Sequence, residues 1–245
     1  MNILAIDAGN SRIKWGWFED GEWQTQAWLA TAETGALGTA WAALPQPDRI
    51  VVSNVAGAAV HGQIVAALAL RFRAEAAWIA GRARQCGVVS SYGEPEQLGA
   101  DRWAALIGAW HRFHGPCLVV GAGTTVTVDA LSGEGVFLGG LIIPGFELMR
   151  GSLARNTAQL KLQDGDFHYF PDNTANAITS GAINALCGAV ERMLGFMQET
   201  GEVMPCVVLS GGVAGLLADR LNARVEVVDN LVLEGLLSIA LDDNG

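Results

Sequence analysis

The sequence predicts an α/β protein composed of two related lobes, and three observations support this class. Its 245 residues exceed the usual length of a single domain. Apolar segments with strand and helix periodicity alternate along the chain. A strand–turn–strand pattern occurs near the start and again near the middle. A hydrophobic content of 51% with only 16% charged residues fits a large folded core and excludes a disordered chain.

The two copies of the strand–turn–strand pattern are separated by a constant interval. The strand, turn and returning strand are predicted at residues 3–7, 8–11 and 13–18 in the first copy, and at 118–120, 122–125 and 126–131 in the second. Gly123 follows Gly9 by 114 residues, and Gly135 follows Gly21 by the same number. This interval is too long for a solenoid repeat and fits two lobes that open alike, although short glycine turns also match by chance.

Strands and helices continue to alternate in the rest of the chain. Strands are predicted near residues 50–52, 78–79, 141–143, 207–209 and 225–228, and helices over 60–73, from 146, over 175–198, up to 221 and over 232–241. No tract rich in proline or serine interrupts this alternation. We therefore place the lobe boundary near Gly115 and Pro116, which gives lobes at residues 1–116 and 117–245.

Charge and apolar patterning argue against several classes of partner and site. A formal net charge of −10 and a pI near 4.8 disfavour nucleic acid and anionic membrane surfaces, so local groups must bind any anionic ligand. No stretch approaches the ~20 apolar residues of a membrane span, and the start lacks a signal-peptide pattern, so we expect a cytoplasmic protein. The four cysteines are far apart, which predicts reduced, buried thiols and no zinc site.

The first polar turn is a candidate phosphate-binding loop. Asp7 ends a predicted buried strand, Gly9 lets the backbone approach a ligand, and Asn10 and Ser11 offer donors. Backbone N–H groups of such a loop can hold phosphate oxygens, while Asp7 holds Mg²⁺ directly or through water and Lys14 neutralises developing charge. The alternative is an ordinary hairpin turn followed by an exposed lysine.

The second polar turn is a candidate partner for the first. Residues 121–125 do not complete a dinucleotide fingerprint, because position 126 is valine and the next segment reads as a strand. The sequence also has no P-loop motif. Thr124 could donate to the terminal phosphates, or the turn could belong only to the core sheet. Residues 210–212 form a further glycine turn, which either accommodates adenosine or is a plain β–α connection.

A short polar segment before a predicted helix offers a candidate base. Trp103, Leu106, Ile107 and Trp110 share one helix face, which places Asp101 in the opening turn. Asp101 could cap the helix and complement its dipole, or accept a proton from a substrate hydroxyl during phosphoryl transfer. The neighbouring Arg102 could pair with an anionic substrate or lie solvated on the helix.

Taken together, these motifs resemble type III pantothenate kinases over nearly the whole chain. The motifs are Asp-x-Gly-Asn-Ser-x-x-Lys at 7–14, Gly-x-Asp-Arg at 99–102, Gly-Thr at 123–124, Gly-Gly-x-Ile-x-Pro-Gly at 139–145, Asn-Thr at 173–174 and the ending at 229–235. The resemblance implies two ribonuclease-H-like lobes of the acetate and sugar kinase/Hsp70/actin superfamily in a homodimer. It also implies ATP-dependent phosphorylation of pantothenate to 4'-phosphopantothenate, the first step of coenzyme A synthesis.

The resemblance also assigns roles to individual residues. ATP phosphates and Mg²⁺ would be bound by Asp7, Ala8, Gly9, Asn10, Ser11, Arg12, Ile13 and Lys14, and ATP also by Thr124. Pantothenate would be contacted by Tyr92, Gly99, Ala100, Asp101, Arg102 and Thr174. Asp101 would be the catalytic proton acceptor, and the carboxylate of pantothenate would give a positive group such as Arg102 a purpose.

The sequence departs from the family pattern at Gly121, where many members carry an aspartate that helps to hold a monovalent cation. A K⁺ or NH₄⁺ requirement is still expected by resemblance, through other ligands or the partner subunit. Two other functions stay open: a kinase for another small alcohol or acid, and a regulator that binds nucleotide without transferring phosphate. The candidate base at Asp101 favours an enzyme over the regulator.

Overall fold

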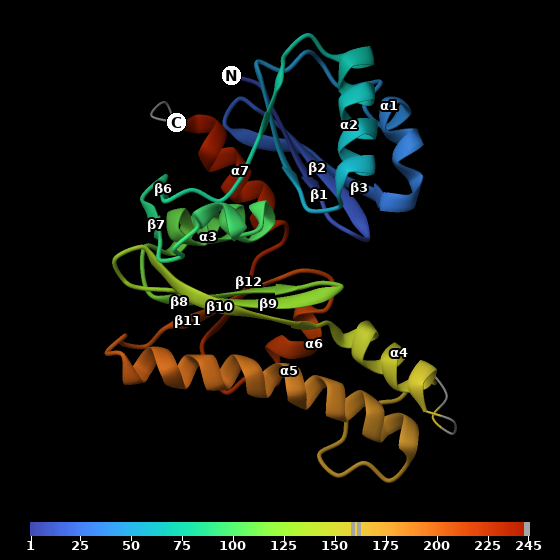
Figure 1. The fold of residues 1–245 in the computed structure, drawn as a ribbon, viewed down its shortest axis with the longest axis vertical. Helices are drawn as coiled ribbons and strands as arrows, with labels where there is room; N and C mark the ends of the chain where they lie inside the picture. The colour runs from blue at the N-terminus through green and yellow to red at the C-terminus, as the bar shows by residue number, and fades with distance from the viewer. Residues whose placement is uncertain (158–159, 161–162, 243–245) are drawn as a thin grey trace. The chain divides into compact units, whose positions relative to one another are not determined.

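The computed structural model describes residues 1–157, 160 and 163–242 (Figure 1). The chain divides into two compact units, Met1–Phe113 together with Asn230–Gly245, and His114–Asp229. From the sequence, we placed the lobes at residues 1–116 and 117–245. The last helix, predicted over 232–241, was therefore assigned to the second lobe, whereas in the structure it belongs to the first unit. Within the described residues, no helix combines the length and hydropathy needed to cross a membrane.

The first unit contains a five-stranded mixed sheet. Its elements are β1 (Ile3–Ala8), β2 (Arg12–Glu19), β3 (Glu22–Ala30), a 3₁₀ helix (Thr31–Ala36), α1 (Leu37–Ala40), β4 (Arg49–Asn54), α2 (Ala58–Arg71), β5 (Ala76–Trp78), β6 (Arg84–Gln85), β7 (Val88–Ser90), a 3₁₀ helix (Pro95–Gln97), α3 (Ala100–Phe113) and α7 (Leu231–Leu241). The strand order is β3-β2-β1-β4-β5. The first three strands run antiparallel, whereas β4 is parallel to both β1 and β5.

The second unit repeats this arrangement. Its elements are β8 (Cys117–Ala122), β9 (Thr125–Leu131), β10 (Val136–Pro144), α4 (Phe146–Asn156), α5 (Thr174–Glu199), β11 (Cys206–Ser210), α6 (Ala214–Ala218) and β12 (Val225–Val227). Their order is β10-β9-β8-β11-β12, again with three antiparallel strands followed by two parallel ones. The two sheets therefore share the topology expected of two ribonuclease-H-like lobes, which confirms the predicted fold class.

The repeated turns also share their hydrogen bonds. The amide of Gly9 donates to the carbonyl of Arg12 at 3.0 Å, and that of Gly123 donates to Thr125 at 3.1 Å. After the parallel strand, the amide of Val55 donates to Ala8 at 3.0 Å, and the amide of Val213 donates to Ala122 at 3.3 Å. In each unit, two loops are thus fixed against the carboxyl end of the first strand.

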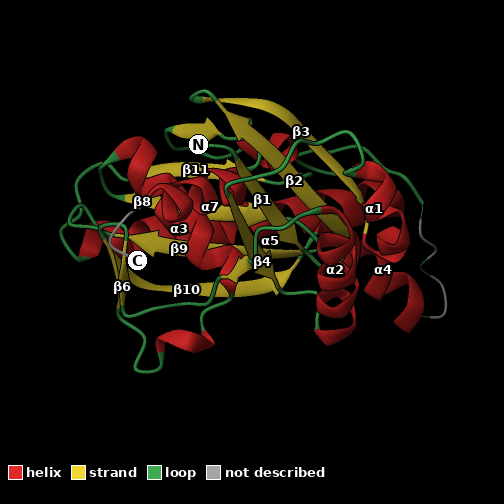
Figure 2. Cartoon of the chain, turned by 90° about the horizontal axis from the view of Figure 1, so that it is seen from above, coloured by secondary structure: helices red, strands yellow, loops and turns green. Residues whose placement is uncertain are grey.

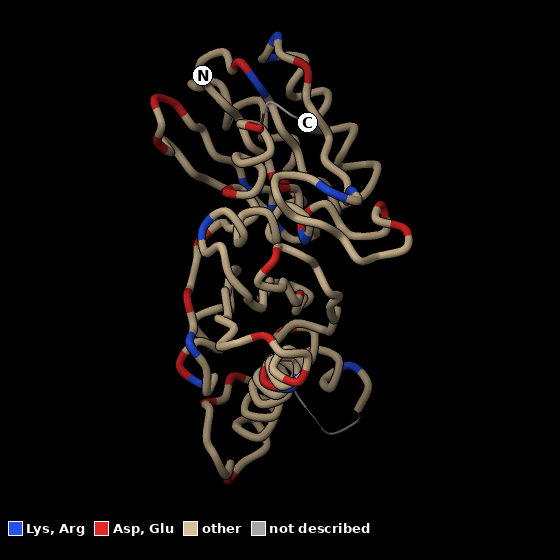
Figure 3. The backbone as a smooth tube through the Cα atoms, turned by 90° about the vertical axis from the view of Figure 1, so that its left-hand side faces the viewer, with Lys and Arg blue, Asp and Glu red and all other residues tan. Residues whose placement is uncertain are grey.

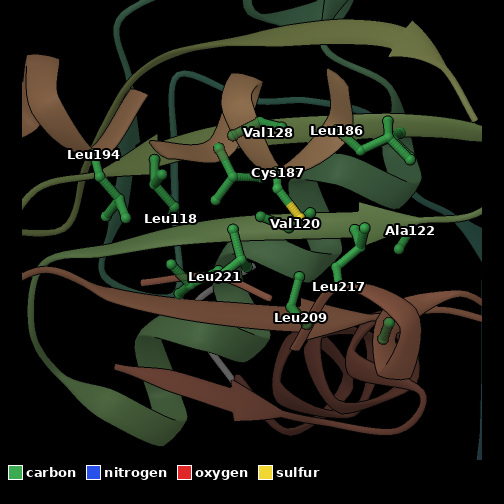
Figure 4. Close-up of a cluster of buried hydrophobic side chains, with 14 of the residues drawn as sticks. Leu118, Val120, Ala122, Val128, Leu186, Cys187, Leu194, Leu209, Leu217 and Leu221 are labelled. Atoms are coloured by element: carbon green, nitrogen blue, oxygen red, sulfur yellow. The ribbon is translucent and has the colours of Figure 1, made fainter. Parts of the chain in front are cut away.

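Each sheet packs an apolar face against helices. In the first unit, the core includes Ile13, Trp15 and Trp17 of β2 together with residues of α1 and α2. Trp15 and Trp17 are therefore core residues. In the second unit, α5 and α6 cover the sheet, as Figure 4 shows for Leu118, Val120, Val128, Leu186, Cys187, Leu194, Leu209 and Leu217. Removing this apolar surface from water is the main stabilising term for each unit.

One strand was not predicted from the sequence, and another is longer in the structure than the sequence pattern indicated. The sequence Glu22–Ala30 forms β3, which was not predicted because most of its side chains are exposed and only Leu29 is buried. The predicted strand at 141–143 extends over all of β10, although two glycines interrupt its pattern. Gly139 has φ of 131° and follows a register shift between Phe137 and Gly139. Glycine tolerates this backbone shape, so the strand continues through the irregularity.

Backbone contact between α3 and α7 requires two glycines. In Figures 1 and 2, α7 runs beside α3. A Cβ added at Gly108 would lie 2.7 Å from the carbonyl oxygen of Leu231, and one at Gly235 only 1.7 Å from that of Ala104. The indole of Trp23 also donates to Glu234 of α7 at 3.0 Å. The small residues allow the helices to pack at backbone contact, which fixes α7 in the first unit.

We predict that Gly235→Ala destabilises the protein by at least about 1–3 kcal/mol, because the new methyl group overlaps the α3 backbone. Urea denaturation followed by circular dichroism measures this change. Gly62→Ala in α2 is the matched control, because a Cβ there meets nothing within 4 Å. It should be neutral or stabilising by up to about 1 kcal/mol. Equal effects of the two substitutions would contradict the proposed packing.

Candidate active site

Four strands of the first unit place a row of side chains on one face of the sheet. Asp7 of β1 is opposite Lys14 of β2 and Ser53 of β4. Lys14 is in turn opposite Trp28 of β3. Paired residues of neighbouring strands project to the same face, so Ser53, Asp7, Lys14 and Trp28 form one continuous row. Ile13 and Trp15 alternate with Lys14 and enter the core on the opposite face.

The turn beside this row has a fixed backbone. Gly9 closes it through the hydrogen bond to Arg12, and an added Cβ at Gly9 would lie 3.3 Å from the Arg12 carbonyl oxygen. The hydroxyl of Thr31 donates to the carbonyl of Gly9 at 2.7 Å, and the amide of Thr31 donates to that of Ser11 at 3.0 Å. Asn10 and Ser11 are exposed at the tip. A polar ligand can therefore reach a loop that is already ordered.

Asp7 is the most electrostatically perturbed group in this row. The pKa of Asp7 is raised to about 7, chiefly by burial and also by the negative charge of Asp101, while the Lys14 charge and the Ser53 hydroxyl lower it. Within the described residues, Asp7 Oδ1 and Ser53 Oγ are buried without a hydrogen-bond partner. The Ser53 hydroxyl is near enough to lower the pKa of Asp7, but neither oxygen makes a well-formed hydrogen bond, which is costly unless a ligand completes the pairing. Carboxylate and hydroxyl oxygens suit a hard cation such as Mg²⁺ or its bound water.

Asp101 lies in the first turn of α3, as predicted. Its Oδ1 accepts the backbone N–H of Arg102 at 2.8 Å, so the carboxylate supports the start of the helix. Burial nevertheless raises the pKa of Asp101, against the lowering effect of that hydrogen bond and of the Arg102 charge. A Cβ added at Gly99 would lie 2.7 Å from Asp101 Oδ1, so glycine makes room for the carboxylate. A carboxylate with a raised pKa is a better proton acceptor.

The remaining first-unit candidates are held in different ways. Arg102 is only 7% exposed, so the alternative of a solvated helix arginine is wrong. Ala100 is also buried and begins α3. Tyr92 is partly buried in the segment between β7 and the second 3₁₀ helix, where its amide donates to Ser90 Oγ at 3.3 Å. The Arg102 charge lowers the pKa of Asp101, so this cation lies in the same electrostatic environment as the candidate base.

In the second unit, three loops meet around the Thr124 turn. The amide of Gly145, at the start of α4, donates to the carbonyl of Thr124 at 3.0 Å. A Cβ at Gly145 would lie 2.3 Å from the Gly123 carbonyl oxygen, and one at Gly211 would lie 2.4 Å from that of Ala122. The glycine turn at 210–212 therefore packs directly against the Gly-Thr turn. Thr124 is exposed at this end of the sheet.

Gly121 and Thr174 complete the sequence-based candidates. Gly121 lies on β8, and a Cβ there would be 2.8 Å from the Thr127 hydroxyl oxygen. A larger side chain would have to displace that hydroxyl.

Thr174 is the exposed first residue of α5. It follows Asn173, whose side-chain oxygen accepts a hydrogen bond from the backbone amide of Asn176 at 3.0 Å. The turn before α5 thus has an ordinary N-cap, which fixes where Thr174 lies in its own unit.

Sequence reasoning missed Ser53. It is 0% exposed and lies next to Asp7 across the β1–β4 pair. The available signal was a small polar residue directly after the apolar segment 50–52, at the carboxyl end of a strand. Strand pairing was needed to place it beside Asp7, because sequence spacing alone does not identify the neighbouring strand.

Charged residues of both signs are dispersed along the chain, as the blue and red segments of Figure 3 show. Arg12 and Lys14 project from the same face of β2, two residues apart. No side-chain hydrogen bond or ion pair involves either cation within residues 1–157, 160 and 163–242. This pair of cations beside Asp7 is suited to a local anion despite the net charge of −10.

We predict that Asp7→Asn stabilises the metal-free protein at pH 8 by up to a few kcal/mol and has little effect at pH 4. The pKa of Asp7 is raised from 3.8 to about 7, so the folded state retains a proton that the unfolded state has released. Wild-type stability therefore falls as pH rises through this interval, whereas the neutral amide avoids the loss. Denaturation across pH 4–8 measures it, with exposed Asp172→Asn as control. A pH-independent difference would contradict this assignment.

Comparisons with known proteins identify the family of the chain and support its fold. Residues 3–195 match the family described as type III pantothenate kinase. A type III pantothenate kinase from Nitrosospira multiformis is 48% identical over 238 residues, covering 97% of this chain and 90% of that protein. The structure superposes on a Campylobacter jejuni protein assigned to the Baf family of transcriptional activators, with a TM-score of 0.62 at 19% identity and 96% of both chains covered.

A second solved structure supports the same fold. A Sinorhizobium meliloti protein assigned as a 2-dehydro-3-deoxygalactonokinase has a TM-score of 0.61 at 18% identity, covering 97% of this chain and 98% of that one. Similarity at such low identity establishes the fold alone. The family match spans most of the chain, and the Nitrosospira relative matches it almost from end to end. The chain therefore belongs to the type III pantothenate kinase family.

Proposed function

We propose that this protein transfers the γ-phosphoryl group of ATP to the hydroxyl of pantothenate, giving 4'-phosphopantothenate for coenzyme A synthesis. The observation that carries the proposal is the pair of carboxylates Asp7 and Asp101, each with a raised pKa, in a chain of this family. Their charges interact, so they lie in one electrostatic environment. Two carboxylates in one site allow one to organise the phosphates and the other to accept a proton.

The first-unit loop would bind the phosphates of ATP. Backbone N–H groups of residues 8–11 would contact phosphate oxygens, and Arg12 and Lys14 would neutralise their charge. The ordered turn supports this role because it needs little rearrangement to bind. Thr124 of the second unit would donate to ATP, and the turn at 210–212 would lie on the adenosine side.

Mg²⁺ would be held through Asp7, with phosphate oxygens and water as further ligands. The unsatisfied Asp7 Oδ1 and Ser53 Oγ fit this assignment. The bound ion would supply charge neutralisation at the phosphates. Asp7 would then be an anion when the ion is present, because a nearby cation favours the charged form of a carboxylate.

Pantothenate would be held on the Asp101 side. Arg102 would pair with its carboxylate, and Tyr92, Gly99, Ala100 and Thr174 would contact the rest of the molecule. Asp101 would accept the proton of the attacking hydroxyl. Its burial supports this role, because burial raises the pKa of the carboxyl toward the working pH and makes it a stronger base.

A monovalent cation and a homodimer stay predictions from the resemblance, and a cytoplasmic location stays a prediction from the sequence pattern. Gly121 replaces the usual aspartate ligand, so K⁺ or NH₄⁺ would need other oxygen ligands or a group from a second subunit. The close approach of Gly121 to the Thr127 hydroxyl leaves little room for a side chain at this position. These finer properties do not alter the assignment of Asp7 and Asp101.

We expect Asp101→Asn to lower kcat for pantothenate phosphorylation by about 10²–10⁴, because the amide cannot accept the hydroxyl proton. ADP release with MgATP, with and without pantothenate and in K⁺ or NH₄⁺, measures this effect. Asparagine keeps the size of aspartate and an oxygen for the Arg102 amide. The variant should therefore have a thermal stability no lower than that of the wild type, because the neutral amide avoids the cost of burying a charge, and it should keep its affinity for MgADP.

The same assay separates the competing functions. Wild-type turnover with another small alcohol or acid, but none with pantothenate, would favour a kinase of different specificity. A regulator would bind MgATP, show no acceptor-dependent ADP release in any cation and be indifferent to Asp101→Asn. Either result would overturn the proposed reaction.

A further inference from the structure

Trp28 extends the site row to the exposed side of the phosphate loop. It lies on β3 opposite Lys14, which is itself opposite Asp7. Neighbouring strands are about 4.8 Å apart, so Trp28 is about two strand spacings from the carboxylate. Its side chain is 55% exposed, unlike Trp15 and Trp17 on the core face of β2. Core packing therefore does not account for this large aromatic side chain.

The exposed ring has a specific partner in the loop. The guanidinium carbon of Arg12 lies over the Trp28 ring, 4.2 Å from its centroid. This distance is within the range of a cation–π interaction, for which tryptophan is the strongest ring. A guanidinium on an aromatic face keeps its in-plane N–H groups directed away from the ring and available to an anion. The cation–π interaction thus restrains the guanidinium of Arg12 and leaves its N–H donors available to an anion.

The surroundings of Arg12 favour the binding of an anionic ligand over an ion pair within the protein. Arg12 begins β2 directly after the Gly9 turn, and Lys14 follows on the same face. Within the residues that the structure describes, neither cation makes a side-chain ion pair or hydrogen bond with the protein. A flexible arginine loses rotamer entropy when it binds a phosphate. A ring that already restrains the guanidinium lowers this cost.

We propose that Trp28 is a positioning residue that holds Arg12 ready for the terminal phosphates of the nucleotide. The inference rests on the proposed ATP site and adds to it a residue that does not itself contact the phosphates. Trp28 acts through Arg12, so its contribution disappears when Arg12 is removed. Trp28 therefore increases the affinity for the phosphates of the nucleotide and has no role in binding its base.

The first experiment measures ligand affinity without turnover. Isothermal titration of MgADP, inorganic tripolyphosphate and adenosine is compared for the wild type, Trp28→Ala, Trp28→Leu and Trp28→Phe. Trp28→Ala and Trp28→Leu should weaken MgADP and tripolyphosphate about two- to fivefold, which corresponds to about 0.5–1 kcal/mol. Trp28→Phe should recover part of the loss, because phenylalanine retains an aromatic face. Adenosine binding should not change.

A double-mutant cycle tests whether the effect passes through Arg12. In an Arg12→Ala background, Trp28→Ala should cause no further loss of tripolyphosphate affinity. Phe196→Ala is the matched control, because Phe196 also carries a stacked arginine, Arg192, at 4.5 Å but lies on α5. This control should leave MgADP affinity unchanged. In steady-state assays, Trp28→Ala should raise the KM for ATP more than it lowers kcat.

Several results would overturn the inference. Equal affinities for Trp28→Leu and wild type would show that the ring contributes nothing to anion binding. Additive losses in the cycle would show that Trp28 acts independently of Arg12, and weaker adenosine binding would make it a base contact. A wild-type protein that binds neither MgADP nor tripolyphosphate would overturn both this inference and the ATP site. Pantothenate enters none of the titrations, so failure of the proposed phosphorylation would leave them unchanged.

Discussion

The central position of β1 determines how the candidate site of the first unit is assembled. This strand pairs antiparallel with β2 and parallel with β4, so its last residues have neighbours on both sides. Asp7 is thereby placed between Lys14 and Ser53, with its Oδ1 buried. A charged carboxylate in this position lowers the stability of the fold when no ligand is bound. Burial is the main reason for its raised pKa. Such a cost at a polar strand end is characteristic of sites built for a ligand.

The two units use one topology for different local chemistry. Both place a short glycine turn at the end of the first strand, and both fix a second loop against it through an amide–carbonyl bond. In the first unit the turn is flanked by a carboxylate and two cations. In the second unit it is flanked by Gly145 and Gly211, whose backbones approach it closely. A duplicated fold therefore provides one charged loop and one loop made largely of backbone groups.

Position along the chain and position in the fold diverge at the C-terminus. Helix α7 follows the second unit in sequence but packs on α3, β1 and β4 of the first. Gly235 permits this contact because a Cβ would overlap the α3 backbone. Asp101 lies at the start of the same α3 helix, and Asp7 lies on β1. The last helix therefore supports both elements that carry the candidate carboxylates, although it contributes neither of them.

The sequence by itself predicted the α/β class, the repeated strand–turn–strand unit and the positions of Asp7, Lys14, Asp101 and Thr124. These features follow from local patterns, since periodicity and turn residues act over a few positions. The tertiary structure decided which strands are neighbours, and so it alone placed Ser53 and Trp28 in the Asp7 row. It also showed that Arg102 is buried and that α7 joins the first unit. These features depend on strand register and helix packing between distant segments, which local sequence patterns do not specify.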